Sequence, residues 1–140
     1  MEAVRELDGK IEKFGQFYRA RARRMASMIY ETGLLSTISY LYAKATKDVY
    51  DKFVSADVKG GVKFELLKNE EKENVAHAAY LYQVLSYISE KLGRAGQERE
   101  PIDFVKKLAE NPIELGVAES LLKPFLIELK HLAEAIWVEE

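Results

Sequence analysis

Residues 19–46 read RARARRMASMIYETGLLSTISYLYAKAT, and the fold depends on how this stretch is divided. Four of its first six residues are arginines: Arg19, Arg21, Arg23 and Arg24. Apolar residues follow at three- and four-residue steps, which is the spacing of a helix that buries one side. They are Met25, Met28, Ile29, Leu34, Leu35, Ile38, Leu41 and Tyr42. Strong positive charge therefore adjoins a helix that belongs to the hydrophobic core.

Gly33 divides this stretch into two helices. Glycine has no Cβ and adopts positive φ angles at no steric cost, so it commonly follows the last turn of a helix. We predict that Gly33 is the C′ residue of the first helix and that Leu34 closes a Schellman-type contact over its last turn. The second helix then begins directly after the glycine.

The apolar pattern is helical along the whole chain. Its spacing predicts core helices over roughly 2–31, 34–54, 75–92 and 112–137. The apolar stripe of 75–92 is broad, which indicates a central helix packed on two sides. No strand-like alternation with turn signals is present. We therefore predict an all-α fold, with one domain over 1–140 that forms a single compact bundle of about five to six helices.

Turn residues mark the last helix. Asn111 is expected to cap it and Pro112 to occupy its first turn, with Glu114 at the capping-box position. Pro124 falls inside the apolar pattern of the same helix. A proline there removes a backbone donor and clashes with the preceding turn, so the helix should either kink or consist of two pieces.

The composition is that of a globular protein. The chain has 140 residues, of which 48% are apolar and 31% charged, and a formal net charge of −2. It contains no cysteine, which excludes disulfides and thiolate chemistry. The N-terminal residues are charged where a secretory signal would be apolar, and no run is long enough to span a bilayer. We therefore expect a cytoplasmic protein that makes no membrane contact.

The charges are unevenly distributed. Residues 10–24 hold six basic residues and one acidic residue, whereas residues 128–140 hold four acidic residues and one basic residue. This polarity suits the stacking of copies of the chain, or the attraction of an anionic ligand to the basic end.

Motifs for catalysis and metal binding are scarce. No phosphate-binding loop, glycine-rich fingerprint or Ser/His/Asp order is present. Glu128 and His131 form a Glu-x-x-His pair of the kind found in di-iron bundles, but the second such pair is missing. Glu73 and His77 share a helix face, an arrangement that is common on solvated helices. We expect no enzymatic activity, no metal and no cofactor.

The arginine cluster is the strongest functional candidate. Guanidinium groups bind phosphates through two parallel hydrogen bonds, and Tyr18 and Tyr30 could offer aromatic faces for bases nearby. If the first two helices pack side by side, Lys44, Lys47 and Lys52 would extend a basic strip. The alternative interpretation is an ordinary solvated helix face with intrahelical ion pairs.

A helical wheel separates the four arginines. Arg19 and Arg23 point away from the apolar stripe, and Arg24 lies at its edge. Arg21 falls within the stripe, so it must extend to solvent, pair with an acid or face a partner surface.

The segment from Arg23 to Leu41 resembles the family of small subunits of the type III-B CRISPR effector, the fifth subunit of the Cmr complex. The family pattern is a basic pair, an apolar segment, Asn-Gly-Leu, a threonine three residues on, and an aromatic residue before leucine. The central residues that match are Gly33, Leu34, Thr37, Tyr40 and Leu41. Thr32 stands in place of the asparagine. Residues 125–135 are similar to the last helix of the family, with Glu128 in place of a usual tryptophan.

The resemblance implies a non-catalytic helical protein present in several copies within a ribonucleoprotein. Its partners would be other subunits of the CRISPR effector complex and copies of itself, stacked beside the subunits that carry the guide RNA. A basic face would hold target RNA against the guide through phosphate contacts, which position a strand without reading its sequence. The residues assigned to that contact are Arg19, Arg21, Arg23, Arg24 and Lys44. The alternative is a helical protein–protein interaction adaptor without nucleic-acid binding.

Overall fold

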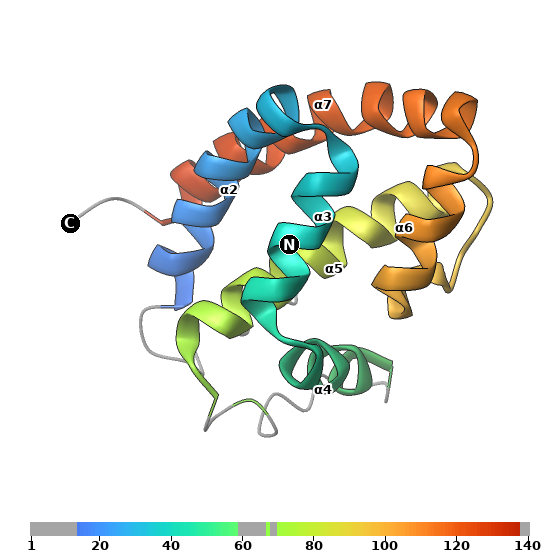
Figure 1. Cartoon of the computed structure of the whole chain (residues 1–140). Helices are drawn as coiled ribbons and strands as arrows, with labels where there is room; N and C mark the ends of the chain where they lie inside the picture. Colours follow the sequence, from blue (N-terminus) through green and yellow to red (C-terminus); the bar gives the residue numbers. More distant parts are fainter. Residues whose placement is uncertain (1–13, 59–66, 68–69, 138–140) are drawn as a thin grey trace.

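The computed structural model describes residues 14–58, 67 and 70–137, which form an all-helical bundle (Figure 1). Within these ranges there are six α-helices and no strand, so the predicted fold class and helix number are confirmed. None of the helices there is long and apolar enough to cross a membrane. The elements are α2 (Phe14–Thr32), α3 (Leu34–Ala45), α4 (Lys47–Val58), α5 (Lys72–Lys91), the 3₁₀ turn η2 (Gln97–Arg99), α6 (Pro101–Ala109) and α7 (Pro112–Ile136).

The first of the expected helices is present from Phe14 onward, and its residues 2–13 lie outside the described part of the chain. The expected central helix corresponds to α5. Every residue from Val75 to Leu81 is buried, so this part of α5 is enclosed on all sides. α2, α3, α4 and α7 all pack against it. Figure 1 shows α5 passing through the middle of the molecule, between α7 at the top and α4 at the bottom.

An aromatic cluster joins α2 to α5 and α7. The ring of Tyr18 lies 5.8 Å from that of Tyr80 and 5.5 Å from that of Trp137, measured between centroids. Burial raises the pKa of Tyr18 well above its ordinary value, so the hydroxyl stays protonated and donates a hydrogen bond to Gln83. The inner face of α2 is therefore held by large side chains, and its opposite face is left to solvent.

The chain changes direction at Gly33, as predicted. Its φ of 85° and ψ of 170° fall in a region that essentially only glycine occupies. The expected Schellman-type contact through Leu34 is wrong. A ψ of 170° extends the chain away from the last turn of α2, and the Leu34 N–H donates instead to a carboxylate oxygen of Glu119 in α7, at 3.3 Å.

The expected single helix over 34–54 is also wrong, because Thr46 divides it into α3 and α4. Thr46 has a φ of 72°, the one positive φ among the non-glycine residues that the structure describes. Its N–H donates to the Tyr42 carbonyl at 3.0 Å, and its hydroxyl accepts from the Val49 N–H at 3.4 Å. The same residue thus ends α3 and begins α4. The apolar spacing continues unbroken past Thr46, so it does not reveal the break between α3 and α4.

The start of α7 follows the sequence prediction in part. The Asn111 side chain accepts from the Glu114 N–H at 3.1 Å, and Pro112 occupies the first turn. The capping box is not completed, because the Glu114 carboxylate accepts from Arg94 at 2.7 Å. Pro124 lies on the exposed side of one continuous helix, so the division of α7 into two pieces is not observed.

Replacing Gly33 with alanine should destabilise the protein through the backbone alone. A Cβ at Gly33 would fit, with its nearest neighbour at 3.7 Å. A side chain at these angles nevertheless costs about 1–3 kcal/mol. We expect Gly33→Ala to lower the free energy of unfolding, measured by urea denaturation, by about that amount.

Gly116 supplies the matched control for this prediction. It lies inside α7 with open space around it, and a Cβ there would meet nothing within 4 Å. Gly116→Ala should therefore stabilise the protein by about 0.5–1 kcal/mol. Equal losses of stability in the two alanine variants would contradict the assignment of strain to Gly33.

Candidate nucleic-acid interface

A shallow trough of 560 Å³ runs along the exposed side of α2. The residues that line it, within the described part of the chain, all belong to this one helix: Gln16, Arg19, Ala20, Arg21, Arg23, Arg24, Ser27 and Glu31. We call this feature the α2 trough. It contains all four arginines of the cluster that the sequence singled out.

Helix geometry sorts the residues of the α2 trough into a floor and two walls. Successive residues turn by about 100°, so Gln16, Ala20 and Ser27 share the face opposite the core and form the floor. Arg19 and Arg23 are one turn apart along one side of this floor. Arg21 and Arg24 lie along the other side. From Gln16 to Ser27 the floor side chains are uncharged, so arginines of both walls can reach an anion placed between them. The acidic Glu31 lies on the same face, at the C-terminal end of the floor.

One wall faces α7 through an ion pair. The Arg23 Nε lies 3.6 Å from Glu134 Oε1, and the Arg23 side chain is 53% exposed. Exposed pairs of this kind stabilise a protein by only about 0–1 kcal/mol. Arg23 can therefore exchange its carboxylate partner for a phosphate at small cost. The prediction that Arg23 points away from the core is confirmed, whereas Arg19 is half-buried.

The same wall ends in an aromatic ring. Tyr30 is 58% exposed, and the Lys123 Nζ of α7 lies 4.9 Å from its ring centroid. The expectation that Tyr18 offers a second aromatic face is wrong, because its ring is fully buried beside Trp137. Sequence reasoning missed Lys123, because it reaches Tyr30 only through the packing of α7 along α2.

The other wall is attached to α5 by a histidine. The Arg21 Nη1 lies 3.4 Å from His77 Nε2, and His77 Nδ1 lies 2.7 Å from the Glu73 carbonyl oxygen. A carbonyl only accepts, so Nδ1 carries the proton and Nε2 accepts from Arg21. The sequence placed Arg21 within the apolar stripe, with an acid as one possible partner. Its observed partner is an imidazole.

Lys44 of α3 belongs to the same side. Its Nζ lies 5.7 Å from the ring centroid of Tyr40, and that ring meets His77 edge-on at 6.4 Å. Burial lowers the pKa of His77, and the charges of Arg21 and Lys44 lower it further, against the opposing effect of the Glu73 carbonyl. The imidazole is therefore neutral at about pH 7.

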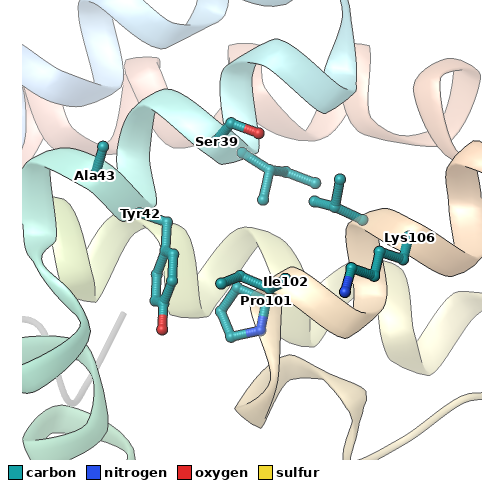
Figure 2. A pocket seen from close by; sticks show the side chains of 8 residues that line it. Ser39, Tyr42, Ala43, Pro101, Ile102 and Lys106 are labelled. Atoms are coloured by element: carbon teal, nitrogen blue, oxygen red, sulfur yellow. The ribbon is translucent and has the colours of Figure 1, made fainter.

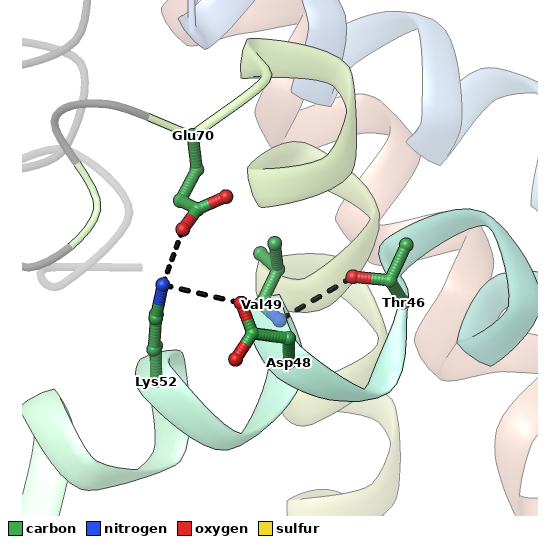
Figure 3. A network of polar contacts seen from close by, with 5 residues as sticks. All are labelled: Thr46, Asp48, Val49, Lys52 and Glu70. Carbon is green, nitrogen blue, oxygen red and sulfur yellow. Dashed lines mark hydrogen bonds and ion pairs between the residues drawn. The ribbon is translucent and has the colours of Figure 1, made fainter.

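The basic surface does not continue along α4, contrary to the sequence expectation. The Lys47 Nζ donates to Asp51 at 2.8 Å. Lys52 lies between Asp48, at 3.1 Å, and Glu70, which precedes α5 (Figure 3). Carboxylates offset both lysine charges, so Lys44 is the one residue of the three that adds to the basic face of α2.

The candidate metal pair lies apart from these residues. Glu128 and His131 are both exposed on α7. No group of three or more His, Cys, Asp or Glu side chains that could hold a metal ion occurs within residues 14–58, 67 and 70–137. In the other candidate pair, the Nδ1 nitrogen of His77 donates to the Glu73 backbone carbonyl, so this nitrogen is not available to a metal ion.

The sequence is similar to that of a known protein family. Residues 1–114 match the sequence model of the family described as CRISPR-associated protein (Cas_Cmr5). The chain belongs to this family. A curated relative from Saccharolobus solfataricus, described as "CRISPR system CMR subunit Cmr5", is 26% identical over 136 residues, which cover 89% of this chain and 81% of that protein. No solved structure matches the chain.

Family membership confirms the resemblance found at the Gly33 motif and makes the chain a small structural subunit of a type III-B CRISPR effector complex. The match includes α2, α3 and α5, and hence both walls of the α2 trough. The similarity of residues 125–135 to the last helix of the family lies beyond the matched range and remains a prediction.

Glu134 should compete with any polyanion that enters the α2 trough. We expect Glu134→Gln to increase affinity for a single-stranded oligonucleotide about two- to fivefold, the value of an exposed ion pair released to a new partner. Fluorescence anisotropy at low salt measures this change. Glu90→Gln removes a negative charge near the C-terminal end of α5 and should leave the affinity unchanged. Equal gains in both variants would show a general charge effect in place of competition for Arg23.

Proposed function

We propose that this chain is a non-catalytic, cytoplasmic subunit that holds target RNA in the α2 trough, against the guide strand of the effector complex. Family membership supports its place in the complex. The arginine-walled trough is the observation that supports the RNA contact. Guanidinium contacts to phosphates fix the position of a strand and carry no sequence information, which suits a subunit that must accept any target.

The α2 trough is elongated along the helix axis. Gln16 and Ser27 are about 17 Å apart along the helix axis, at about 1.5 Å per residue. The net charge of −2 attracts no nucleic acid by itself, so the contact depends on the local concentration of positive charge. Tyr30 with Lys123 offers a flat ring beside a cation at one end, a combination that stacks bases of any identity.

Copies of the chain stack through apolar surfaces in this proposal. A groove of 340 Å³ separates α3 from α6, with Tyr42 and Ser39 on one side and Ile102 and Pro101 on the other (Figure 2). An unpartnered face of α7 carries Ile113, which is 82% exposed, together with exposed Val117 and Ile127. The Lys106 ammonium at the groove and the exposed Glu128 after Ile127 supply opposite charges.

We assign the α7 face of one copy to the α3–α6 groove of the next. The two surfaces differ, so the contact is heterologous, and a heterologous contact that does not close into a ring generates a filament. The same surfaces would serve the alternative function, a protein-interaction adaptor without nucleic-acid binding. The two functions differ in whether the α2 trough binds RNA.

Removing one wall of the α2 trough should change the salt dependence of RNA binding. Each phosphate contact to a single strand contributes about 0.7 to the slope of log affinity against log salt. We expect Arg19→Gln with Arg23→Gln to reduce this slope by about 1.4 for the isolated chain and a short oligouridine. Lys91→Gln with Lys107→Gln removes the same charge elsewhere and should leave the slope unaltered. An unchanged slope in the arginine variant would favour the adaptor function.

Stacking is tested separately from RNA binding. Val117→Asp places a charge on the α7 face, and Ile102→Asp places one in the α3–α6 groove. Both residues are exposed, so folding should persist, as far-ultraviolet circular dichroism can verify. Sedimentation velocity should show concentration-dependent association of the natural chain and its loss in either variant. Association that survives both substitutions would exclude this pair of surfaces.

A further inference from the structure

We propose that Arg21, Lys44 and His77 form a proton-linked binding site for a single phosphate group, at the junction of α2, α3 and α5. The assignment of its ligand as an RNA phosphate rests on the proposed function. Arg21 and Lys44 contact the phosphate. His77 is a positioning residue that holds Arg21 in one state and releases it in the other.

Three helices bring the members of this site together. Arg21 comes from α2, Lys44 from α3 and His77 from α5, and these helices pack against one another. His77 is 5% exposed, so its ring orientation is fixed by its surroundings and by the bond from Nδ1 to the Glu73 carbonyl. Tyr40 packs edge-on against the same ring, and the Lys44 ammonium lies over the Tyr40 ring.

The charges around His77 favour an anion nearby. The neutral ring has one acceptor nitrogen, Nε2, and the donor that it meets at 3.4 Å is a cation, the Arg21 guanidinium. The charged groups that face the ring are Arg21 from α2, Lys44 from α3 and Glu73 from its own helix. Two cations therefore share one acid, and a phosphate would supply the missing negative charge.

Protonation of His77 changes the arrangement between two states. In the neutral state Nε2 accepts from Arg21 and keeps the guanidinium against α5. A proton on Nε2 removes that acceptor and places two positive charges side by side, so Arg21 turns outward into the α2 trough. The released guanidinium and the new imidazolium charge both favour an anion. Phosphate binding and proton uptake are therefore linked.

The sign of this linkage sets the pH dependence. Burial and the two cations keep the pKa of His77 below its ordinary value in the free chain, and a bound phosphate must raise it. Affinity for phosphate is then highest below the free pKa. It falls as pH increases through the interval between the free and bound values, by up to about tenfold per pH unit.

Proton NMR of the two histidine rings tests this directly on the full chain. The His77 pKa is measured in the free chain, with inorganic phosphate, with a short oligouridine, and with sodium chloride at matched ionic strength. We expect phosphate and oligouridine to raise the pKa of His77 by at least about half a unit, equivalent to about a threefold change in affinity, and chloride to leave it unchanged. His131, exposed on α7, is the internal control and should not respond.

The outcomes distinguish a failure of this phosphate site from a failure of the proposed function. A response to inorganic phosphate without a response to oligouridine keeps the phosphate site and removes RNA as its ligand. Salt-dependent oligouridine binding with an unchanged His77 pKa keeps the proposed function and overturns the site. A response to chloride equal to that of phosphate would reveal non-specific screening and would also overturn it.

Variants provide a second readout in the same binding assay. Affinity of the natural chain for oligouridine should increase about three- to tenfold as the pH is lowered from about 8 to below the pKa that NMR gives for His77 in the free chain. His77→Gln should abolish this dependence and His131→Gln should retain it. A pH dependence that survives His77→Gln would contradict the proposal.

Discussion

Gly33 joins α2 to α3 with a φ of 85° and a ψ of 170°, and the direction in which the chain leaves this residue determines where the basic side chains lie. Two hydrogen bonds hold the turn, one local and one to α7. The Thr37 hydroxyl donates to the Gly33 carbonyl at 2.7 Å, and the Leu34 N–H donates to Glu119 of α7. A residue with a Cβ would resist these angles, so glycine is a geometric requirement at this position.

The consequences of this turn extend to both walls of the α2 trough. With α2 and α3 both packed on α5, Arg21 contacts His77 and Lys44 lies over the Tyr40 ring that packs against it, while the opposite edge of α2 lies along α7. The buried Tyr18 and its aromatic neighbours fix the rotation of α2 about its own axis. That rotation leaves the uncharged floor residues Gln16, Ala20 and Ser27 facing solvent between two rows of arginines. A chain with a small net charge thereby presents a strongly basic surface.

Local signals in the sequence predict most of the helices well. They do not predict which residues of other helices each one contacts. Apolar spacing predicts α2, α5 and α7, and Gly33 and Asn111 mark two of the junctions because each has a definite backbone role. Thr46 gives no such signal, since the apolar period runs on from Leu41 through Ala45 to Val49. Its break depends on how α4 docks against α5, which is tertiary information.

The candidate site shows the same contrast between local signals and contacts that depend on packing. The arginines of α2 are predicted from charge and helical spacing, and Tyr30 is predicted from its neighbourhood. His77, Lys123 and Glu134 are far from α2 in the sequence and become partners of Arg21, Tyr30 and Arg23 only through packing. The carboxylates that offset Lys47 and Lys52 act at close range, but which pairs form depends on side-chain geometry.

Photo-crosslinking of target RNA within the assembled effector complex tests the central claim most directly. Thiouridine placed along the target strand, followed by mass spectrometry of the crosslinked peptides, identifies the helix of this subunit that lies next to the strand. We expect crosslinks concentrated between Gln16 and Glu31, with Tyr30 among the modified residues. Crosslinks confined to α4, α6 or the exposed face of α7, or found only in other subunits, would contradict it.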